Sequence, residues 1–217
     1  MGKIYFTADW HSGEPQLPNT HSFLRPYPTE VMLERWLQQC YEILQDEDLL
    51  VFVGDLAITL LDLDFYSRLP VCKKILVLGD KEYANKNFSR KDCLGTLIAL
   101  KIFDEIVEDM EIEVMGINYF VSHKPEDCLK QELPAICGHI HGSWRTMQMP
   151  NGQPIINVGI DVWGGLVSGE FITHQFNAIT KFYDINAKPY NWATLKYPEC
   201  SNCGQPKSMI EYFPSGK

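Results

Sequence analysis

Carboxylate and imidazole side chains follow the ends of apolar segments at five places in this sequence. Oxygen and imidazole donors in one site suit Mn, Fe, Zn or Ni better than Ca or a magnesium cage built from protein alone. The pattern therefore predicts a metal site. The residues concerned lie in Asp9-Trp10-His11, Gly54-Asp55, Gly79-Asp80, Ser122-His123 and Gly138-His139-Ile140-His141-Gly142.

The segments before the three aspartates must bring them together. Lys3–Ala8, Leu49–Val53 and Lys74–Leu78 are apolar runs typical of buried strands. Strands that alternate with helices predict a parallel sheet, whose carboxyl ends meet at one edge. Helices are expected at Thr29–Leu44, at Asp62–Arg68, and from Ser89 to about Lys101, where Asp92 is placed for a capping box.

The second half of the chain predicts further strands with few helices between them. We expect a second, mostly antiparallel sheet packed on the first. In an extended segment His139 and His141 share one face, so they can serve two neighbouring metals. The expected strands are Glu111–Val114, Ile117–Ser122, Ala135–Cys137, Ile155–Val158, Glu170–His174 and Lys181–Ile185.

Each of these polar residues has an ordinary explanation when it is taken alone. An aspartate after a strand is usually a turn residue or a helix cap, and a single histidine is usually a core or surface residue. The ordered set of three strand-end aspartates, one isolated histidine and a His-x-His between glycines favours the metal site.

Composition limits the class of protein. The chain has 217 residues and 45% hydrophobic residues, enough for one well-buried domain. We see neither a secretory signal nor a run of about 20 apolar residues, so we expect a soluble cytoplasmic protein without a membrane segment. Five of the seven cysteines lie in apolar surroundings and are expected to be reduced core residues: Cys40, Cys72, Cys93, Cys128 and Cys137.

The formal net charge of -9 bears on the partner. Proteins that hold a nucleic acid duplex need a basic face to neutralise phosphates, and the sequence offers none. A small phosphorylated substrate is therefore favoured over nucleic acid, with the oligomeric state left open.

The motif order, over about residues 1–188, resembles the calcineurin-like metallophosphoesterase superfamily, in particular its phage and bacterial members. The resemblance implies a four-layer α/β/β/α sandwich of two mixed sheets flanked by helices, with two divalent metal ions at one edge. Mn²⁺ is the first choice, and Fe, Zn, Ni or Mg are alternatives. One metal would be held by Asp9, His11, Asp55 and His141, and the other by Asp55, Asp80, His123 and His139, with Asp55 bridging.

The same resemblance implies a metal-dependent phosphoric ester hydrolase, either a phosphohydrolase or a phosphodiesterase. The two metals would share a water and lower its pKa, so that a metal-bound hydroxide serves as the nucleophile near neutral pH. Asp55 would act in catalysis as the bridge.

Lys81 departs from the family pattern, in which Gly-Asn-His stands where this chain has Gly79-Asp80-Lys81. The aspartate keeps a ligand oxygen, but the missing histidine is the residue thought to protonate the leaving group or to contact phosphate. Lys81 can bind phosphate as a point charge, yet lysine, with a reference pKa of about 10.4, is a poor general acid at neutral pH. We therefore expect Lys81 to support substrates with good leaving groups; its alternative is a solvated turn lysine.

Other residues have two open interpretations. Arg25, in Leu24-Arg25-Pro26-Tyr27, either contacts substrate phosphate or pairs with an acid and fixes its loop. Trp10 and Trp163 either line the crevice or pack in the core. Asp161 is expected to stabilise a loop, and His174 to be structural within a strand.

Residues 189–217 predict a C-terminal extension with a CxxC knuckle, Cys200-Ser201-Asn202-Cys203. A structural zinc needs four ligands, and no second pair follows. A zinc site at Cys200 and Cys203, two free thiols and a disulfide all remain open.

Two alternative functions also remain. The missing histidine motivates a catalytically weakened protein of the same fold that binds phosphate, nucleotide or a protein partner. A nuclease acting on single-strand ends is the other, and the negative net charge disfavours it.

Overall fold

Three parallel strands end side by side at one edge of the first sheet. They are β1 (Ile4–Thr7), β2 (Leu49–Val53) and β3 (Lys73–Val77), and β6 (Glu105–Val107) extends the parallel set. The sheet has the order β12-β1-β2-β3-β6, in which β12 (Val167–Ser168) is antiparallel to β1. The computed structural model describes residues 2–14, 25, 27–85 and 87–182.

The second sheet has the order β10-β11-β9-β8-β7. Its inner strands β8, β9 and β11 are parallel, whereas β7 and β10 pair antiparallel at the edges. The expectation of a mostly antiparallel sheet is therefore wrong: the sheet is mixed, because crossover connections precede β9 and β11. The strands are β7 (Asp109–Val114), β8 (Ile117–Ser122), β9 (Ala135–Cys137), β10 (Thr146–Gln148) and β11 (Pro154–Asn157).

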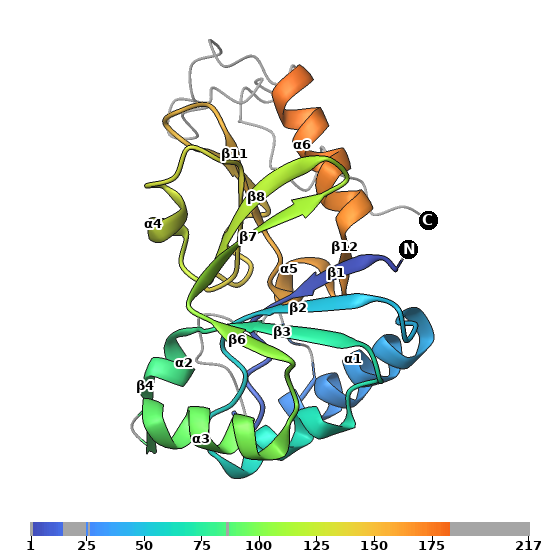
Figure 1. The fold of residues 1–217 in the computed structure, drawn as a ribbon, viewed down its shortest axis with the longest axis vertical. Helices are drawn as coiled ribbons and strands as arrows, with labels where there is room; N and C mark the ends of the chain where they lie inside the picture. The colour runs from blue at the N-terminus through green and yellow to red at the C-terminus, as the bar shows by residue number, and fades with distance from the viewer. Residues whose placement is uncertain (1, 15–24, 26, 86, 183–217) are drawn as a thin grey trace, which may run out of the picture. The chain divides into compact units, whose positions relative to one another are not determined.

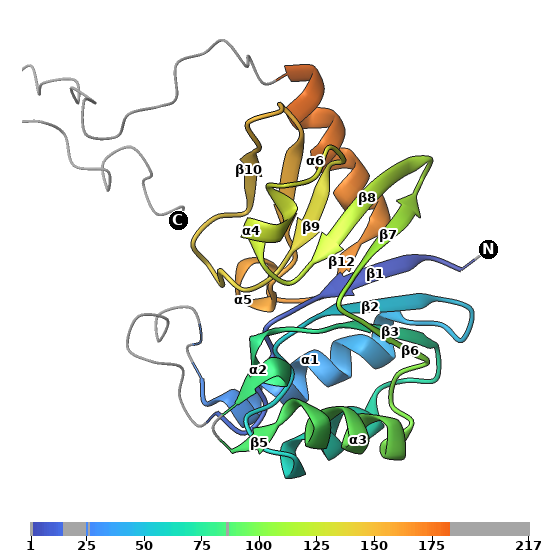
Figure 2. The same ribbon diagram turned by 60° about the vertical axis from the view of Figure 1, so that its left-hand side comes forward.

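Helices and sheets form four layers, which confirms the α/β/β/α sandwich. The helices α1 (Thr29–Ile43) and α3 (Arg90–Leu100) and the 3-10 helix η1 (Leu61–Arg68) cover the outer face of the first sheet, as Figure 2 shows. The short helix α4 (Pro125–Cys128) packs on β8 and β9 at the outer face of the second sheet. The two inner faces pack on each other.

Alternating side chains of β2 explain this layering. Leu50 and Phe52 point toward the helices, whereas Val51 and Val53 point toward the second sheet, and all four are fully buried. A strand that is buried on both faces must be apolar along its whole length. The sequence Leu-Leu-Val-Phe-Val meets that requirement.

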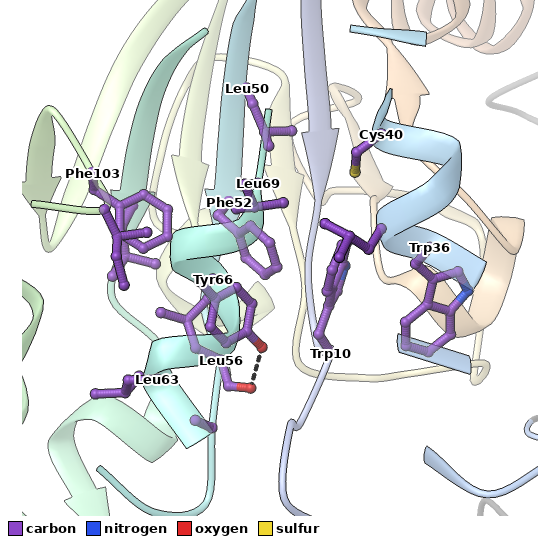
Figure 3. Packing of buried hydrophobic residues seen from close by; sticks show 14 of the residues in the cluster. Trp10, Trp36, Cys40, Leu50, Phe52, Leu56, Leu63, Tyr66, Leu69 and Phe103 are labelled. Atoms are coloured by element: carbon purple, nitrogen blue, oxygen red, sulfur yellow. Dashed lines mark hydrogen bonds between the residues drawn. The ribbon is translucent and has the colours of Figure 1, made fainter. Parts of the chain in front are cut away.

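Trp10 belongs to the core on the helix side (Figure 3). Its ring lies 5.1 Å from Phe52 in an edge-on contact and 5.7 Å from Trp36. Its indole N–H donates to the Thr7 hydroxyl at 2.7 Å. The side chain is fully buried, so Trp10 packs in the core and does not line a crevice.

The helix over residues 90–100 begins as its sequence predicts. Ser89 is the N-cap of α3, and its side chain accepts a hydrogen bond from the Asp92 backbone N–H. The Asp92 carboxylate in turn accepts from the Ser89 backbone N–H, at 3.3 Å. The capping box is therefore confirmed.

Removing this cap by Ser89→Ala is expected to lower the free energy of unfolding by about 1 kcal/mol. The loss leaves a first-turn N–H of α3 without its side-chain acceptor. Denaturant unfolding measures the change, and Lys91→Ala, at an exposed position of the same helix, is the control with an expected effect within about 0.5 kcal/mol. Equal stabilities of Ser89→Ala and wild type would contradict the prediction.

The C-terminal part of the described chain is helical where strands were predicted. Instead of strands at Glu170–His174 and Lys181–Ile185, the chain forms α6 (Gly169–Phe182); residues 183–185 lie outside the described part. The β-branched residues favoured strands, but Ile172, Phe176 and Ile179 recur at helical spacing. Ile172 and Phe176 pack in the core between the sheets, and α6 contacts strands of both sheets. His174 is exposed on the helix rather than placed within a strand.

Several short elements have no clear sequence signal. They are α2 (Asp80–Tyr83), the hairpin of β4 (Ala84–Asn85) and β5 (Phe88–Ser89), and α5 (Ile160–Trp163). Both α2 and α5 follow directly after strands of the two sheets. They therefore hold polar side chains close to the strand ends.

The five predicted core cysteines are all buried and free, as expected. Among the described residues, no helix combines the length and the apolar character needed to cross a bilayer. The extension at residues 189–217, with Cys200 and Cys203, lies outside the described residues, so the zinc interpretation stays a prediction.

Candidate metal centre

The turns after β1 and β2 continue the sheet beyond its strands. The Asp9 N–H donates to the Gly54 carbonyl and the His11 N–H to the Asp55 carbonyl, each at 3.1 Å. The two turns therefore run side by side. In Figure 1 these strand ends lie at the left of the first sheet, on the side of α2.

The backbone of this region is unusual. Among the described residues, seven non-glycine residues have positive φ. Left-handed backbone is sparsely populated for such residues and concentrates at functional sites. Five of the seven are predicted metal ligands: Asp9, His11, Asp55, His139 and His141.

Gly54 is required by close packing under Asp55. Its φ is 79°, and an added Cβ would lie 2.5 Å from His123 Nδ1 and 2.6 Å from the Gly79 Cα. No L side chain fits that space without displacing backbone. The small residue lets the ends of β2, β3 and β8 approach one another.

Six of the seven predicted ligands fall into two compact groups. The first group is Asp9, His11 and His141, and the second is Asp80, His123 and His139; within each, candidate ligand atoms lie within 4.8 Å of one another. Asp55 also groups with Asp9 and His123. The structure thus brings together all seven residues singled out from the sequence.

Asp55 lies between the two groups. One carboxylate oxygen is 3.5 Å from His11 Nε2, and the other is 3.4 Å from His123 Nε2. Both histidine nitrogens are buried and have no hydrogen-bond partner among the described residues. Buried polar atoms normally have a partner, and a metal ion would supply one. The residues therefore fit a pair of divalent ions.

Burial and neighbouring charges shift the pKa values of several candidate ligands. Burial raises the pKa of Asp9, and the nearby histidines offset only part of that effect. For Asp55 burial acts in the same direction, but His123, His11 and Lys81 outweigh it and lower the pKa. The pKa of His123 is raised, because Asp55 and Asp9 outweigh burial. The raised pKa values favour the protonated forms of Asp9 and His123, and each of these groups must lose its proton in order to bind a metal.

Two histidines are oriented by bonds on their far side. His123 Nδ1 lies 2.8 Å from the Val53 carbonyl, which can only accept, so Nδ1 carries the proton and Nε2 faces Asp55. His141 Nδ1 lies 2.6 Å from the Asp161 carboxylate. This bond outweighs burial and raises the pKa of His141. Carboxylate–histidine pairs of this kind fix imidazole ligands in metal sites.

Asp161→Asn is expected to weaken metal binding at the first group by about 10–100-fold. The amide keeps the size of the side chain but no longer holds the His141 ring with a charged acceptor. Calorimetric titration of Mn²⁺ measures the effect. Asp64→Asn, on the exposed face of η1, is the matched control, and identical affinities for both variants would contradict the prediction.

The guanidinium of Arg25 contacts three segments that are distant from one another in sequence. Its guanidinium donates to both oxygens of Asp161, at 2.7 and 3.1 Å, and to the carbonyls of Asp9 and Trp10. It also lies over the Trp36 ring, 5.1 Å from the centroid. The structure therefore supports the interpretation in which Arg25 pairs with an acid and fixes its loop.

Glu82 was missed in the sequence, although it lies two residues after Asp80. It is fully buried and accepts hydrogen bonds from the backbone N–H groups of Gly79, Asp55 and Leu56, at 2.7, 3.1 and 2.8 Å. Burial raises its pKa, and the charge of Asp55 adds to this. Glu82 therefore joins the turns after β2 and β3. Its position beside a strand-end Gly-Asp pair was the available signal.

Asp161 binds the ring of His141, and Asn157 binds the loop that carries it. Asn157 donates to the His141 and Trp144 carbonyls and accepts from the Gly159 N–H, so it fixes the loop that carries His141. Trp163 is half-buried and donates to the Asn157 carbonyl at 2.7 Å. Asp161 follows β11 as the other aspartates follow their strands, and its contact with the His141 ring goes beyond the expected stabilisation of a loop.

Two lysines approach the centre from different elements. The backbone N–H of Lys81 donates to Asp55 at 2.8 Å, and its charge adds to those of His123 and His11, which lower the pKa of Asp55. Lys124 was not singled out in the sequence, although it directly follows His123. Its ammonium lies 2.5 Å from Asp80.

Comparisons with known proteins give a likeness of fold. A crystal structure of a protein of unknown function from Aquifex aeolicus is 22% identical, with a TM-score of 0.59 over 81% of this chain and 100% of that chain. An archaeal phosphodiesterase is 18% identical, with a TM-score of 0.45 over 72% of this chain and 83% of its own. The phosphopantetheinyl hydrolase of Mycobacterium tuberculosis is 12% identical, with a TM-score of 0.38 over 73% and 89%.

The first of these likenesses establishes a shared fold, and the other two are too distant to establish one. No protein-family model matches the sequence. No curated protein matches it either.

Proposed function

We propose that this protein is a metal-dependent phosphoric ester hydrolase, a distant relative of the calcineurin-like metallophosphoesterases. One observation carries the proposal: the Asp55 carboxylate faces two buried histidine nitrogens that have no hydrogen-bond partner among the described residues. A single carboxylate placed between two ligand groups suits a bridge between two ions.

The ligand assignment follows the two groups. Asp9, His11, His141 and Asp55 would hold one ion, and Asp80, His123, His139 and Asp55 the other. Two such ions would supply Lewis-acid stabilisation of the phosphoryl oxygens and an activated water. Mn²⁺ is our first candidate for both positions.

The chain's own residues prepare this site before any ion binds. Asp161 and the Val53 carbonyl hold the rings of His141 and His123. Arg25 holds the turn that carries Asp9 through two backbone carbonyls. We therefore assign Arg25 a positioning role rather than contact with substrate.

The second group is the side from which substrate would approach. Asp80 and His139 retain 37% and 34% exposure of their side chains, whereas His11 and Asp55 retain 3% and 6%. A phosphate ester can reach the exposed group without any rearrangement of the core.

Metal reconstitution tests the proposal directly. Metal-free protein loaded with Mn²⁺ should bind two ions per chain and hydrolyse 4-nitrophenyl phosphate or its methyl ester, and chelation should abolish the activity. Two bound ions without hydrolysis of any monoester, diester or nucleotide would favour a phosphate-binding protein instead. The lysine at position 81 motivates that second candidate.

Lys81→His is expected to improve hydrolysis of alkyl phosphates relative to aryl phosphates by about tenfold or more. A histidine can protonate a poor leaving group near neutral pH, whereas a lysine ammonium cannot, and general acids contribute about 10²–10⁴-fold. The ratio of kcat/KM values for the two ester types is the measurement. Lys73→His, at the opposite end of β3, is the control. An unchanged ratio in Lys81→His would contradict the prediction.

A further inference from the structure

A cavity of about 360 Å³ adjoins the second ligand group. Asp80 and His123 line it, and its other walls come from α2, α4 and the crossing from β6 to β7. The volume is near the lower end of the range for small-molecule sites. It therefore suits one small organic group beside a phosphoryl group at the second ligand group.

Lys124 contributes the single lysine or arginine side chain among the described residues that line this cavity. Its ammonium is 2.5 Å from Asp80 Oδ1, while Asp80 Oδ2 faces His139 Nδ1 at 3.5 Å. The Lys124 side chain is 44% exposed, so the ammonium can also reach an incoming ligand. Through Asp80 it adjoins the second ligand group.

The other charged side chains that line the cavity are acidic, so they disfavour a second anionic group of the ligand. Glu108, Asp109 and Asp127 also line it. Arg90 pairs with Glu108 and Lys130 with Asp127, both from outside the lining. Asp109 is exposed on β7. A second anionic group in the cavity would therefore meet carboxylates, so the organic part of the ligand should carry no negative charge.

Tyr83 also lines the cavity. The residue is 37% exposed, and its ring lies under the Arg90 guanidinium, which is 4.2 Å from the ring centroid. With Leu78, it gives the cavity an apolar surface against which a small substituent can pack. The cavity therefore has room for one small organic substituent.

We propose that Lys124 is a phosphate-binding residue and that the substrates are small phosphate monoesters whose uncharged alcohol portion occupies this cavity. The inference rests on the proposed function and narrows it. A dianionic monoester gains more from an added ammonium than a monoanionic diester does. A diester would also need room for a second substituent.

Binding of inorganic phosphate to the manganese-loaded protein tests this inference without turnover. Lys124→Gln should raise the Kd for phosphate by about 10–100-fold, as expected for the loss of one charged hydrogen bond, and Lys124→Arg should restore most of the affinity. Lys73→Gln is the control, since Lys73 is exposed at the opposite end of β3 and does not line the cavity. Calorimetry gives the affinities, and thermal melting verifies folding.

Kinetics supply the second arm of the test. For Lys124→Gln, KM for 4-nitrophenyl phosphate should rise by about tenfold or more, while KM for its methyl ester changes by less than about threefold. Equal phosphate affinity in wild type and Lys124→Gln overturns the inference. Loss of a metal ion from Lys124→Gln at unchanged phosphate affinity also overturns it, since Lys124 would then only hold Asp80.

The two proposals fail in different ways. If wild type binds phosphate or hydrolyses esters and Lys124→Gln behaves identically, the inference falls and the proposed function stands. If metal-loaded wild type neither binds phosphate nor hydrolyses any ester, both fall.

Discussion

Asp55→Asn is expected to reduce ester hydrolysis by about 10³-fold or more and to lower the metal content from two ions per chain to one or none. The Asp55 carboxylate presents one oxygen toward His11 and the other toward His123. An amide keeps one oxygen and turns N–H donors toward the other ligand group, where they repel a cation. Loss of a single electrostatic element of an active site already costs about 10²–10³-fold, and this substitution would disturb both ions.

The size of the side chain is unchanged in this variant, so the fold should persist. Metal analysis after gel filtration and kcat/KM on an aryl phosphate are the two measurements. Asp46→Asn, an exposed aspartate between α1 and β2, is the control. Two tightly bound ions and near wild-type turnover in Asp55→Asn would show that the bridge has been assigned to the wrong residue.

Glu82→Ala is expected to lower the free energy of unfolding by about 2–4 kcal/mol. Three backbone N–H groups would lose their acceptor inside the protein, and each unsatisfied group costs about 1–3 kcal/mol. The burial that raises the pKa of Glu82 makes its charge costly, so relief of that cost offsets part of the loss. The net effect remains destabilising because three donors depend on one side chain.

Glu82→Gln distinguishes this account from a simple loss of packing. Its single acceptor oxygen can serve the two N–H groups that now share Oε2, so the loss should be smaller than in Glu82→Ala. Glu113→Gln, exposed on β7, should have an effect within about 0.5 kcal/mol. Equal destabilisation by Ala and Gln at position 82 would mean that the hydrogen bonds contribute little.

The positions of the seven candidate ligands were predictable because they depend on a simple geometric rule. Apolar runs such as Leu49–Val53 identify parallel strands, and a polar residue directly after such a strand lies at the common edge. The structure brings Asp9, Asp55 and Asp80 together in that way. The capping box of α3 was predictable for a similar reason, since Ser89 and Asp92 are close in sequence.

The residues that orient the ligands were not predictable, because their roles depend on contacts distant in sequence. Arg25 meets Asp161 across 136 positions, and a sequence pattern alone does not specify that pairing. Glu82 acts through three backbone groups that only the folded turns bring within reach. The sequence of α6 predicts strands because it contains β-branched residues. Its apolar residues also recur at helical spacing, and this spacing determines the structure because the two sheets provide a surface on which a helix packs.

The backbone link between Asp9 and His139 has a consequence for the order of folding. The His139 N–H donates to the Asp9 carboxylate, and these residues are 130 positions apart. Such a contact requires the closure of a long loop, which costs entropy before any gain is realised. The first ligand group takes residues from both sheets, so under the proposed ligand assignment metal capture would follow the packing of the two sheets. Ions present earlier would meet only the ligands of the first sheet, Asp9, His11, Asp55 and Asp80, and would lack the histidines that the second sheet contributes.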